Sequence, residues 1–427
     1  MSQVNKTPLS SIVSSTTGGG TPERSNPALW NGGIPWASVK DFQDKNRKLT
    51  CTQEEISREG LNRSASHLIP AGTPIICTRM AVGRIAIAAV PTAINQDLRA
   101  LHLRDGFDVD YVVLAIEGIR EKIESLSIGS TVKGISIEQL LRFEIPDFPL
   151  EEQTKIAEIL SMVDRAIEQT EAFIAKQQRI KTGLMQDLLT RGIDEHGNLR
   201  SEETHEFKDS PLGRIPAEWD VSSCAQVCTE IVVGIVIRPA QYYRPDGVPV
   251  LRSANVRPNQ ISKDDLVFMN EVDNEILRKS QLRTGDLVTV RTGYPGTTAV
   301  VPPELDKCNC VDIVITRPRR EVVRSEFLSI WVNSDNGKRQ VLEGQGGLAQ
   351  QHFNVGEMRK LRVKVPPLSE QERIEATIHG HESLLRRIQS NALKLGFLKK
   401  ALMQDLLTGK KRVTALLEPE APAVQTP

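Results

Sequence analysis

The sequence predicts a mixed α+β protein in which two α/β domains alternate with two long amphipathic helices. Three observations predict this class. The chain contains a gap-free internal repeat, each copy has an apolar stripe of helical spacing, and the segment before each copy mixes short β-rich runs with helical stretches. With 427 residues, the chain is long enough for two or three domains that each bury a core.

The repeat is clearest in two segments of about forty residues. Residues 149–190 (PLEEQTKIAEIL…KTGLMQDLLT) align without a gap with residues 367–408 (PLSEQERIEATI…KKALMQDLLT), so that Pro149 matches Pro367. The block LMQDLLT is identical in both copies. Such a run of identities in register indicates a duplication.

Each copy is predicted to be one long helix, because its apolar residues recur in steps of three and four like a heptad seam. At about 1.5 Å per residue, forty residues form a rod of about 60 Å. Proline precedes each helix, and acidic residues occupy its first turn, where the helix dipole favours them. We expect the two stripes to pack against each other. Their residues are Ile156, Leu160, Val163, Ile167, Leu184 and Leu188, and Ile374, Ile378, Leu385, Ile388, Leu402 and Leu406.

The repeat extends weakly into the domains before the helices, where Gly72 and Gly83 correspond to Gly285 and Gly296, and Arg79 falls near Arg291. Strands are expected in runs such as PIIC, IAIA and LVTV. The predicted division of the chain is residues 1–148 for the first head, 149–192 for the first helix, 193–215 for an exposed connector, 216–366 for the second head, 367–409 for the second helix and 410–427 for a disordered tail.

Composition excludes several classes of protein. No apolar run is long enough to cross a bilayer, and the first residues lack the pattern of a signal peptide, so we expect a cytoplasmic protein. The six cysteines form no paired CxxC knuckles, which predicts reduced thiols and no zinc site. The 54 basic and 54 acidic residues balance to a net charge of zero, so bulk charge does not point to nucleic acid.

Catalytic motifs are missing from the sequence. There is no GxxxxGK[ST] phosphate loop, and neither Pro-Pro pair lies in the Asn/Asp-Pro-Pro-aromatic loop that an amino-methyltransferase needs. The string from Glu304 to Lys307 is the nearest approach to a metal-dependent nuclease, but it follows two prolines in an expected loop. We therefore expect a non-catalytic protein without a bound cofactor or metal.

Several strings together resemble the specificity subunit of type I restriction-modification systems. They are GGGTPERSNPALWNGGIPWASVKDF, SPLGRIPAEWDV, GDLVTVRTGYPG and the doubled PL-x-EQ helix ending in LMQDLLT. Each string is weak alone, and their order and duplication make the set specific. The resemblance implies two target-recognition domains related by a pseudo-two-fold repeat, with two antiparallel coiled-coil helices between them that act as a ruler.

The resemblance also implies partners. Each head would read one half of a split, asymmetric site in double-stranded DNA, and the helices would set the unread gap and dock two methyltransferase subunits. Restriction subunits would join through these partners, which would supply the sites for S-adenosylmethionine, ATP and Mg. Two alternatives stay open: a related system whose partner fuses methyltransferase and nuclease, and a coiled-coil assembly scaffold that binds no DNA.

Base reading needs forked donors and amides, such as Arg for guanine and Asn or Gln for adenine. We expect such contacts from polar residues in the turns and loops of each head. The candidates are Ser38, Lys40, Arg79, Arg84 and Lys133 in the first head, and Arg252, Asn255, Arg257, Arg291, Tyr294, Gln350, Gln351 and His352 in the second.

Phosphate contacts are predicted for Lys45, Arg47 and Lys48. Because the net charge is zero, we expect the isolated chain to bind DNA weakly and to need its partners to close around the duplex.

Overall fold

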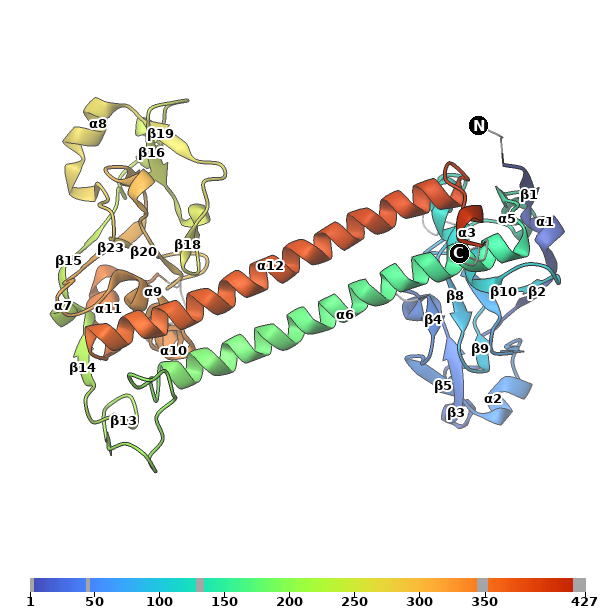
Figure 1. Cartoon of the computed structure of the whole chain (residues 1–427), viewed down its shortest axis with the longest axis horizontal. Coiled ribbons are helices and arrows are strands. Elements are labelled where there is room, and N and C mark those ends of the chain that lie inside the picture. Colours follow the sequence, from blue (N-terminus) through green and yellow to red (C-terminus); the bar gives the residue numbers. More distant parts are fainter. Residues whose placement is uncertain (1–3, 44–46, 128–133, 344–351, 418–427) are drawn as a thin grey trace, which may run out of the picture. The chain divides into compact units, whose positions relative to one another are not determined.

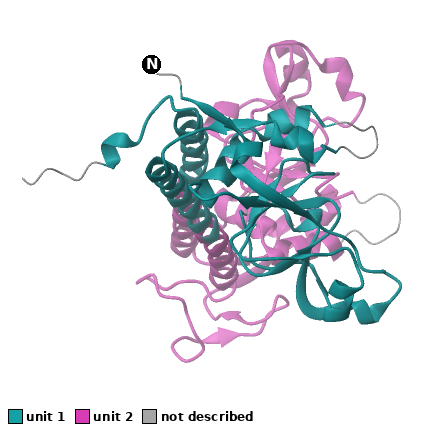
Figure 2. Ribbon diagram, turned by 90° about the vertical axis from the view of Figure 1, so that its right-hand side faces the viewer, with its two compact units in different colours: residues 1–172, 390–427 teal, residues 173–389 magenta. Residues whose placement is uncertain are grey.

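The computed structural model describes residues 4–43, 47–127, 134–343 and 352–417. The chain forms two compact units (Figure 2). Unit 1 comprises Met1–Ala172 and Ser390–Pro427, and unit 2 comprises Phe173–Gln389. Both long helices cross this boundary, so each unit contains one head, the beginning of one long helix and the end of the other. The end of the chain therefore belongs to the same unit as the first head.

The first head is built on two β-sheets (Figure 1), one with the strand order β2-β10-β7-β8-β4 and one with the order β5-β3-β9-β6. Strands β7 and β8 are apolar and buried along their whole length, as expected for strands covered on both faces. The strands are β2 (Val13–Gly18), β3 (Trp30–Ala37), β4 (Lys48–Leu49), β5 (Glu54–Ile56), β6 (Leu68–Ile69), β7 (Pro74–Cys77), β8 (Ile85–Ala88), β9 (Thr92–Ile94) and β10 (Leu98–Leu103).

Helix α3 (Val109–Gly118) supplies much of the first head's core, because its residues from Tyr111 to Ile116 are all buried. Asp108 caps this helix by accepting a hydrogen bond from the backbone N–H of Tyr111 at 2.9 Å. The other short helices are α1 (Leu9–Ile12), η1 (Pro27–Leu29), η2 (Val39–Asp41), α2 (Arg58–Asn62), α4 (Arg120–Ser125) and α5 (Ile137–Leu141).

The second head has a four-stranded sheet of order β15-β23-β20-β21 and a three-stranded sheet of order β19-β16-β22. Its strands are β12 (Phe207–Lys208), β13 (Ile215–Pro216), β15 (Cys228–Val233), β16 (Val248–Leu251), β17 (Val256–Arg257), β18 (Gln260–Ile261), β19 (Val267–Met269), β20 (Leu287–Val290), β21 (Thr298–Val300), β22 (Asn309–Cys310) and β23 (Ile313–Pro318). Its helices are α7 (Cys224–Val227), η3 (Pro239–Tyr242), η4 (Ser253–Asn255), α8 (Glu271–Ile276), η5 (Arg278–Ser280), η6 (Pro303–Leu305), α9 (Ser325–Asn333), α10 (Asp335–Glu343) and α11 (Val355–Lys360).

The two heads follow the same plan. In each, an early strand pairs with the strand directly before the long helix: β1 (Lys6–Pro8) with β11 (Glu144–Pro146), and β14 (Asp220–Ser223) with β24 (Arg362–Val365). The glycines matched by the repeat also share their backbone conformation, since φ is +84° at Gly72 and +87° at Gly285. The duplication therefore extends through both heads, although few of their residues match.

The long helices are α6 (Leu150–Leu188) and α12 (Leu368–Leu407). Each ends a few residues before its expected limit, because a turn begins at Leu189 in the first case and at Thr408 in the second. In unit 1, Ile156 and Leu160 are buried with Leu406, and Leu402 packs beside them. In unit 2, Leu188, Ile374 and Ile378 are buried and Leu184 packs against them. Between these ends the stripe residues are buried or half-buried, namely Val163, Ile167, Leu385 and Ile388.

Within each unit the two helix segments run antiparallel. In unit 1, the Lys399 ammonium lies 3.0 Å from the Asp164 carboxylate, which joins the last part of α12 to the first part of α6. In unit 2, Lys181 and Glu382 form the same contact at 2.6 Å. These two ion pairs occupy matching positions of the repeat, so the duplication preserved the pairing of the helices.

Two segments expected to be loose are anchored. The connector after α6 contains buried Ile193, Arg200 and Ile215, and its strands β12 and β13 pair. At the start of the tail, Val413 is buried and Thr414–Leu416 form the 3-10 helix η7. Both segments contact the beginning of a long helix, which their polar composition did not reveal. Residues 418–427 lie outside the described part of the chain.

Candidate nucleic-acid interface

The segments of the first head that carry Ser38, Lys40, Arg79 and Arg84 lie next to one another. The strand before Ser38 is joined to the β9–β10 connection by a hydrogen bond from the N–H of Asn95 to the carbonyl of Ala37, at 3.0 Å. That connection continues to Asp97, whose carbonyl accepts from the N–H of Thr78 at 2.8 Å. The carbonyl of Thr78 accepts in turn from Ile135 at 2.9 Å. We call residues 38–42, 78–84, 97 and 134–135 the first-head surface.

The second head repeats this arrangement. The N–H of Val311 donates to the carbonyl of Leu251 at 2.9 Å, and the N–H of Phe353 donates to the carbonyl of Arg291 at 3.0 Å. Arg291 also forms an ion pair with Asp312. We call residues 252–255, 291–296, 312 and 352–353 the second-head surface. These bonds make Thr78 the structural counterpart of Arg291. The sequence repeat instead placed Arg79, one position further along the chain than Thr78, near Arg291.

The predicted residues of the first-head surface differ in availability. Lys40 is exposed, and Arg79 has 58% of its side chain exposed with its guanidinium 3.8 Å from Asp97. Ser38 is half-buried and forms a capping box with Asp41, whose carboxylate accepts from the Ser38 backbone N–H at 2.8 Å and also from its hydroxyl at 3.2 Å. Arg84 is also half-buried and donates to the carbonyl of Phe42 at 3.0 Å. Ser38 and Arg84 therefore shape the surface, while Lys40 and Arg79 face outward. Lys133 lies outside the described residues.

In the second head, Arg257, Tyr294 and His352 are exposed. Arg257 lies on β17, and the Nδ1 atom of His352 lies 2.9 Å from the hydroxyl of Thr292 in the β20–β21 turn. Arg252 is half-buried and donates to the carbonyl of Asp265 at 2.6 Å. The structure thus brings together residues of the turn and of the segment before α11. Gln350 and Gln351 lie outside the described residues.

Asn255 does not face outward as predicted. Only 1% of the residue is exposed, and its amide group is used within its own loop. The side chain donates to the carbonyls of Ser262 and Asp264, at 3.3 and 2.8 Å, and accepts from the N–H of Arg252 at 3.0 Å. A side chain held in this way has no free edge for a base. Asn255 is therefore a structural residue of the second-head surface.

The structure also contradicts the predicted phosphate contact of Arg47. Its side chain is 18% exposed and forms ion pairs with Glu117 of α3 and Asp164 of α6. Burial lowers the pKa of this guanidinium from its usual value, and the nearby carboxylates counteract that effect. Arg47 therefore links the first head to the long helix. Lys48 begins β4 and is exposed, and Lys45 lies outside the described residues.

The cysteines near these surfaces are uncharged at neutral pH. Burial raises the pKa of the Cys77 thiol, at the end of β7, to about 12, and has the same effect on Cys308. Such thiols pack as small apolar groups. Among the described residues, no three His, Cys, Asp or Glu side chains are grouped to hold a metal ion. No described helix combines the length and apolarity needed to cross a bilayer.

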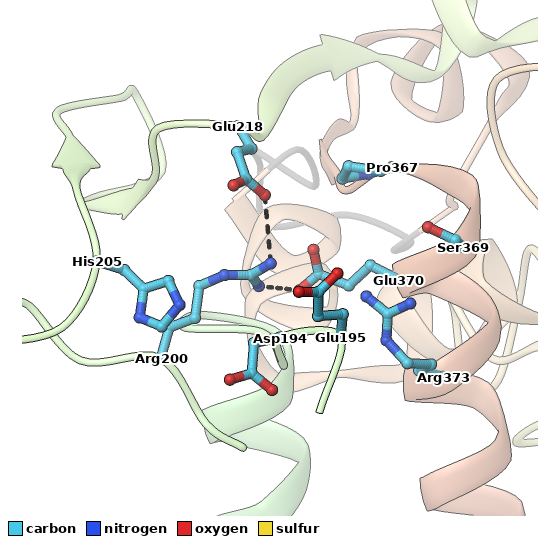
Figure 3. Close-up of a pocket in the computed structure, with 9 residues that line it drawn as sticks. All are labelled: Asp194, Glu195, Arg200, His205, Glu218, Pro367, Ser369, Glu370 and Arg373. Carbon is cyan, nitrogen blue, oxygen red and sulfur yellow. Dashed lines mark hydrogen bonds and ion pairs between the residues drawn. The ribbon is translucent and has the colours of Figure 1, made fainter. Parts of the chain in front are cut away.

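Sequence reasoning missed the residues that fix the long helices. In unit 2, Glu370 at the start of α12 is 1% exposed and forms an ion pair with Arg200 of the connector (Figure 3). Glu370 also accepts from the N–H of Ile193 at 2.9 Å and from the indole N–H of Trp219 at 3.0 Å. Arg200, Glu218 and Glu370 line a polar cavity of about 360 Å³ with Asp194, Glu195, His205, Pro367, Ser369 and Arg373.

Unit 1 contains the matching contact. Glu152 at the start of α6 is buried, and its carboxylate accepts from Arg412, which follows α12, at 2.8 Å. In each unit, the segment after one long helix is thus fixed to the start of the other. We call these two ion pairs, Glu152–Arg412 and Glu370–Arg200, the anchor pairs.

The glutamine after each anchor glutamate joins the helix to its head. Gln153 accepts from the N–H of Asp108 at 3.0 Å and donates to the carbonyl of Phe148 at 2.7 Å. Gln371 accepts from the N–H of Arg324 at 2.8 Å and donates to the carbonyl of Pro366 at 2.8 Å. The signal was present in the sequence, because Glu and Gln are identical in both copies of the repeat. Acidic residues in a first helical turn are common, however, and were assigned to the helix dipole.

A family model described as the type I restriction modification DNA specificity domain matches residues 1–176, which contain the first head and part of α6. The type I restriction enzyme MjaIX specificity subunit of Methanocaldococcus jannaschii is 22% identical over 414 residues, covering 95% of this chain and 93% of that protein. This chain is therefore similar to the specificity subunits of type I restriction-modification systems along almost its whole length. The resemblance inferred from the sequence motifs is confirmed.

Solved structures of type I systems show the same fold. The S subunit of the type I restriction-modification system from M. genitalium matches with a TM-score of 0.56 at 15% identity, covering 95% of this chain and 97% of that one. A chain from a structural study of complex assembly and conformational transition of the type I system matches with a TM-score of 0.61 at 16% identity, covering 96% and 99%. The predicted mixed fold with two long helices is therefore confirmed.

Proposed function

We propose that this chain reads a bipartite, asymmetric DNA site, with the first-head surface on one half-site and the second-head surface on the other. The observation that carries the proposal is that the two surfaces have the same backbone arrangement and different outward side chains. The first-head surface presents Lys40 and Arg79, and the second-head surface presents Tyr294 and His352. One scaffold with two sets of donors suits two different base sequences.

The helices would set the unread gap and dock two methyltransferase subunits. The block LMQDLLT is identical in both copies and ends beside an anchor pair in each unit, whereas the head surfaces differ. Two copies of one partner require two equivalent surfaces, and the matching helix ends that carry these blocks would supply them. S-adenosylmethionine, ATP and Mg would be bound by the partner subunits, and this chain would bind none of them. Restriction subunits would join through the same complex.

Mapping N6-methyladenine across the host genome tests this function. We expect a split motif with two different half-sites that disappears when this gene is deleted. Exchanging residues 216–366 for the second head of another specificity subunit should change one half-site and leave the other unchanged. An unchanged methylation pattern in both strains would reject the proposal and favour a scaffold that binds no DNA.

A further inference from the structure

One turn in each head exposes a large side chain on the surface assigned to DNA. Met80, in the β7–β8 turn, is 67% exposed, and Tyr294, in the β20–β21 turn, is 81% exposed. Met80 also has a φ of 62°, in the left-handed region. That conformation is unfavourable for a residue with a side chain, because its Cβ atom approaches the following carbonyl oxygen. Strain of this kind persists where neighbouring structure enforces it, often at functional sites.

The two turns have the same backbone. The N–H of Gly83 donates to the carbonyl of Cys77 at 3.0 Å, and the N–H of Gly296 donates to the carbonyl of Val290 at 3.0 Å. In the second head the residue matching Met80 is Gly293, also left-handed with a φ of 92°. The large side chain is therefore on the left-handed residue in the first head and on the next residue in the second.

Both turns are held against a helix. A Cβ atom on Gly83 would lie 3.2 Å from Cγ of Arg120 in α4, and one on Gly296 would lie 2.8 Å from Val341 in α10. The hydrogen bonds of Thr78 with Ile135 and of Arg291 with Phe353 fix the other side of each turn. The exposed side chains thus stand on turns that are braced on two sides.

We propose that Met80 and Tyr294 insert between stacked bases of the duplex, one in each half-site. This inference rests on the proposed function. Apolar and aromatic side chains presented on a rigid element can enter a base step, and nearby donors hold the backbone in place. Arg79, with 58% of its side chain exposed, lies directly before Met80, and the exposed His352 lies beside the Tyr294 turn.

The difference between the two heads favours DNA over a protein partner at these turns. A surface that docks two copies of one subunit should keep the same residues in both halves, as the block LMQDLLT does. The turns instead carry methionine in one half and tyrosine in the other. Two unlike side chains on one backbone fit two unlike half-sites.

The test uses the full-length chain assembled with its methyltransferase and a duplex containing the mapped methylation site. Each nucleotide in turn is replaced by an abasic one, and the Kd is measured. Where a side chain inserts, the missing base removes the cost of unstacking. We therefore expect binding about tenfold tighter at one step in each half-site, which corresponds to the roughly 1.4 kcal/mol of one stacking step.

Three variants assign these steps to side chains. Met80→Gly should abolish the gain in affinity from the abasic nucleotide in the first half-site only. Tyr294→Ala should abolish the gain in the second half-site only. Tyr294→Phe should retain it, because the ring is kept. Met80→Gly also relieves the left-handed strain, so its urea midpoint should equal or exceed that of the parent chain. A lost step in this variant then cannot be attributed to misfolding.

Exposed apolar residues away from the turns serve as matched controls. Met162→Ala on α6 and Ile276→Ala on α8 should leave both steps unchanged, since these residues are 46% and 73% exposed but lie outside both surfaces. The inference would be overturned if no abasic nucleotide tightened binding of the parent complex, or if the tighter binding persisted in both turn variants. Either result would leave the proposed function intact. Loss of methyltransferase from the Met80→Gly complex would also overturn the inference, because the turn would then bind protein. If no methylated site depends on the chain, both proposals fail together.

Discussion

The effect of a buried polar residue on the stability of the second head depends on whether that residue has hydrogen-bond partners. Asn255 is buried with every polar group of its amide engaged, and it stabilises its loop. Lys364, on β24, is 1% exposed, and its ammonium group has no ion pair or hydrogen bond among the described residues. Burial lowers the pKa of Lys364 from 10.5 to about 8. An unpartnered charge in this position weakens the head.

Lys364→Met should therefore stabilise the protein at pH 7 by about 2–3 kcal/mol, somewhat less than the full pKa difference corresponds to because solvent screens part of the charge. In the parent chain the folded state loses its proton near pH 8, whereas the unfolded state keeps it to about pH 10.4. Stability should thus be lowest below pH 8 and should rise as the pH increases from 8 to about 10.4. Urea unfolding at pH 7 and pH 9.5 measures both effects.

In the Lys364→Met variant, the free energy of unfolding should no longer show the rise with pH that titration of this lysine causes. Lys360→Met is the matched control, because the Lys360 side chain is 75% exposed in the same head. It should change neither the midpoint at pH 7 nor the pH dependence by more than a few tenths of a kcal/mol. Equal stability of Lys364→Met and the parent chain at pH 7 would show that the ammonium group finds a partner in solution.

At the scale of elements, each long helix is fixed at its start by an anchor pair. The glutamates of the two anchor pairs occupy matching positions of the repeat, but their arginines are buried to different extents. Both anchor glutamates are buried. Their arginines differ, since the Arg200 side chain is 6% exposed and that of Arg412 is 39% exposed. Removing a carboxylate leaves the arginine buried in one case and able to regain water in the other.

Glu370→Ala should therefore cost about 3–5 kcal/mol, the usual effect of leaving a buried charge unpaired. Glu152→Ala, at the matching position of the repeat, should cost clearly less, because Arg412 can turn into solvent. Urea unfolding of both variants, with hydrogen exchange at the start of each helix, makes the comparison.

Glu372→Ala, at an exposed position two residues after Glu370, is the control and should be close to neutral. Equal losses for Glu152→Ala and Glu370→Ala would contradict the idea that exposure of the arginine sets the difference. No loss from either variant would show that the anchor pairs do not fix the helices.

For the whole molecule, the balance of charge limits the affinity for DNA that the chain can have by itself. The net charge is zero, and several arginines on the candidate surfaces are engaged within the chain, as in the Arg291–Asp312 ion pair. Each such pair engages a cation that could otherwise contact phosphates, which normally supply most of the affinity for DNA. If the chain reads DNA as proposed, we therefore expect it to need other subunits to hold the duplex.

The isolated chain should therefore bind its site weakly at physiological salt, with a Kd of about 10⁻⁶ M or weaker, as for non-specific binding. Adding the methyltransferase should tighten binding by at least tenfold and should steepen its dependence on salt. Fluorescence anisotropy with a labelled duplex at several salt concentrations measures both. Tight, sequence-specific binding by the purified chain alone would refute this expectation.

The ruler hypothesis can be tested by lengthening both helices. Seven residues inserted before Leu184 and seven before Leu402 add about 10 Å to each helix, about the rise of three base pairs. A heptad keeps the seam in phase, and insertion in both helices leaves each anchor pair in place. We expect the unread gap in the methylated motif to grow by about three base pairs with both half-sites unchanged.

Insertion before Leu184 alone is the control, because α6 would then outgrow α12 and the anchor pairs Glu152–Arg412 and Glu370–Arg200 could not both form. This variant should lose methylation or stability. Altered half-site bases in the double insertion would contradict the division between reading heads and spacing helices.

The sequence by itself determined the duplication, the two long helices and the family resemblance, because heptad spacing and a run of identities depend only on the order of residues. It also located the turns and segments that form the candidate surfaces, since glycines and polar clusters mark them. Only the tertiary structure decided which side chains remain free. Asn255 and Arg47 have the chemistry of DNA contacts but are engaged within the chain, whereas Met80 lacks polar groups and stands exposed. Burial and hydrogen bonding join residues far apart in sequence, as Glu370 joins Arg200, and no local pattern encodes such pairings.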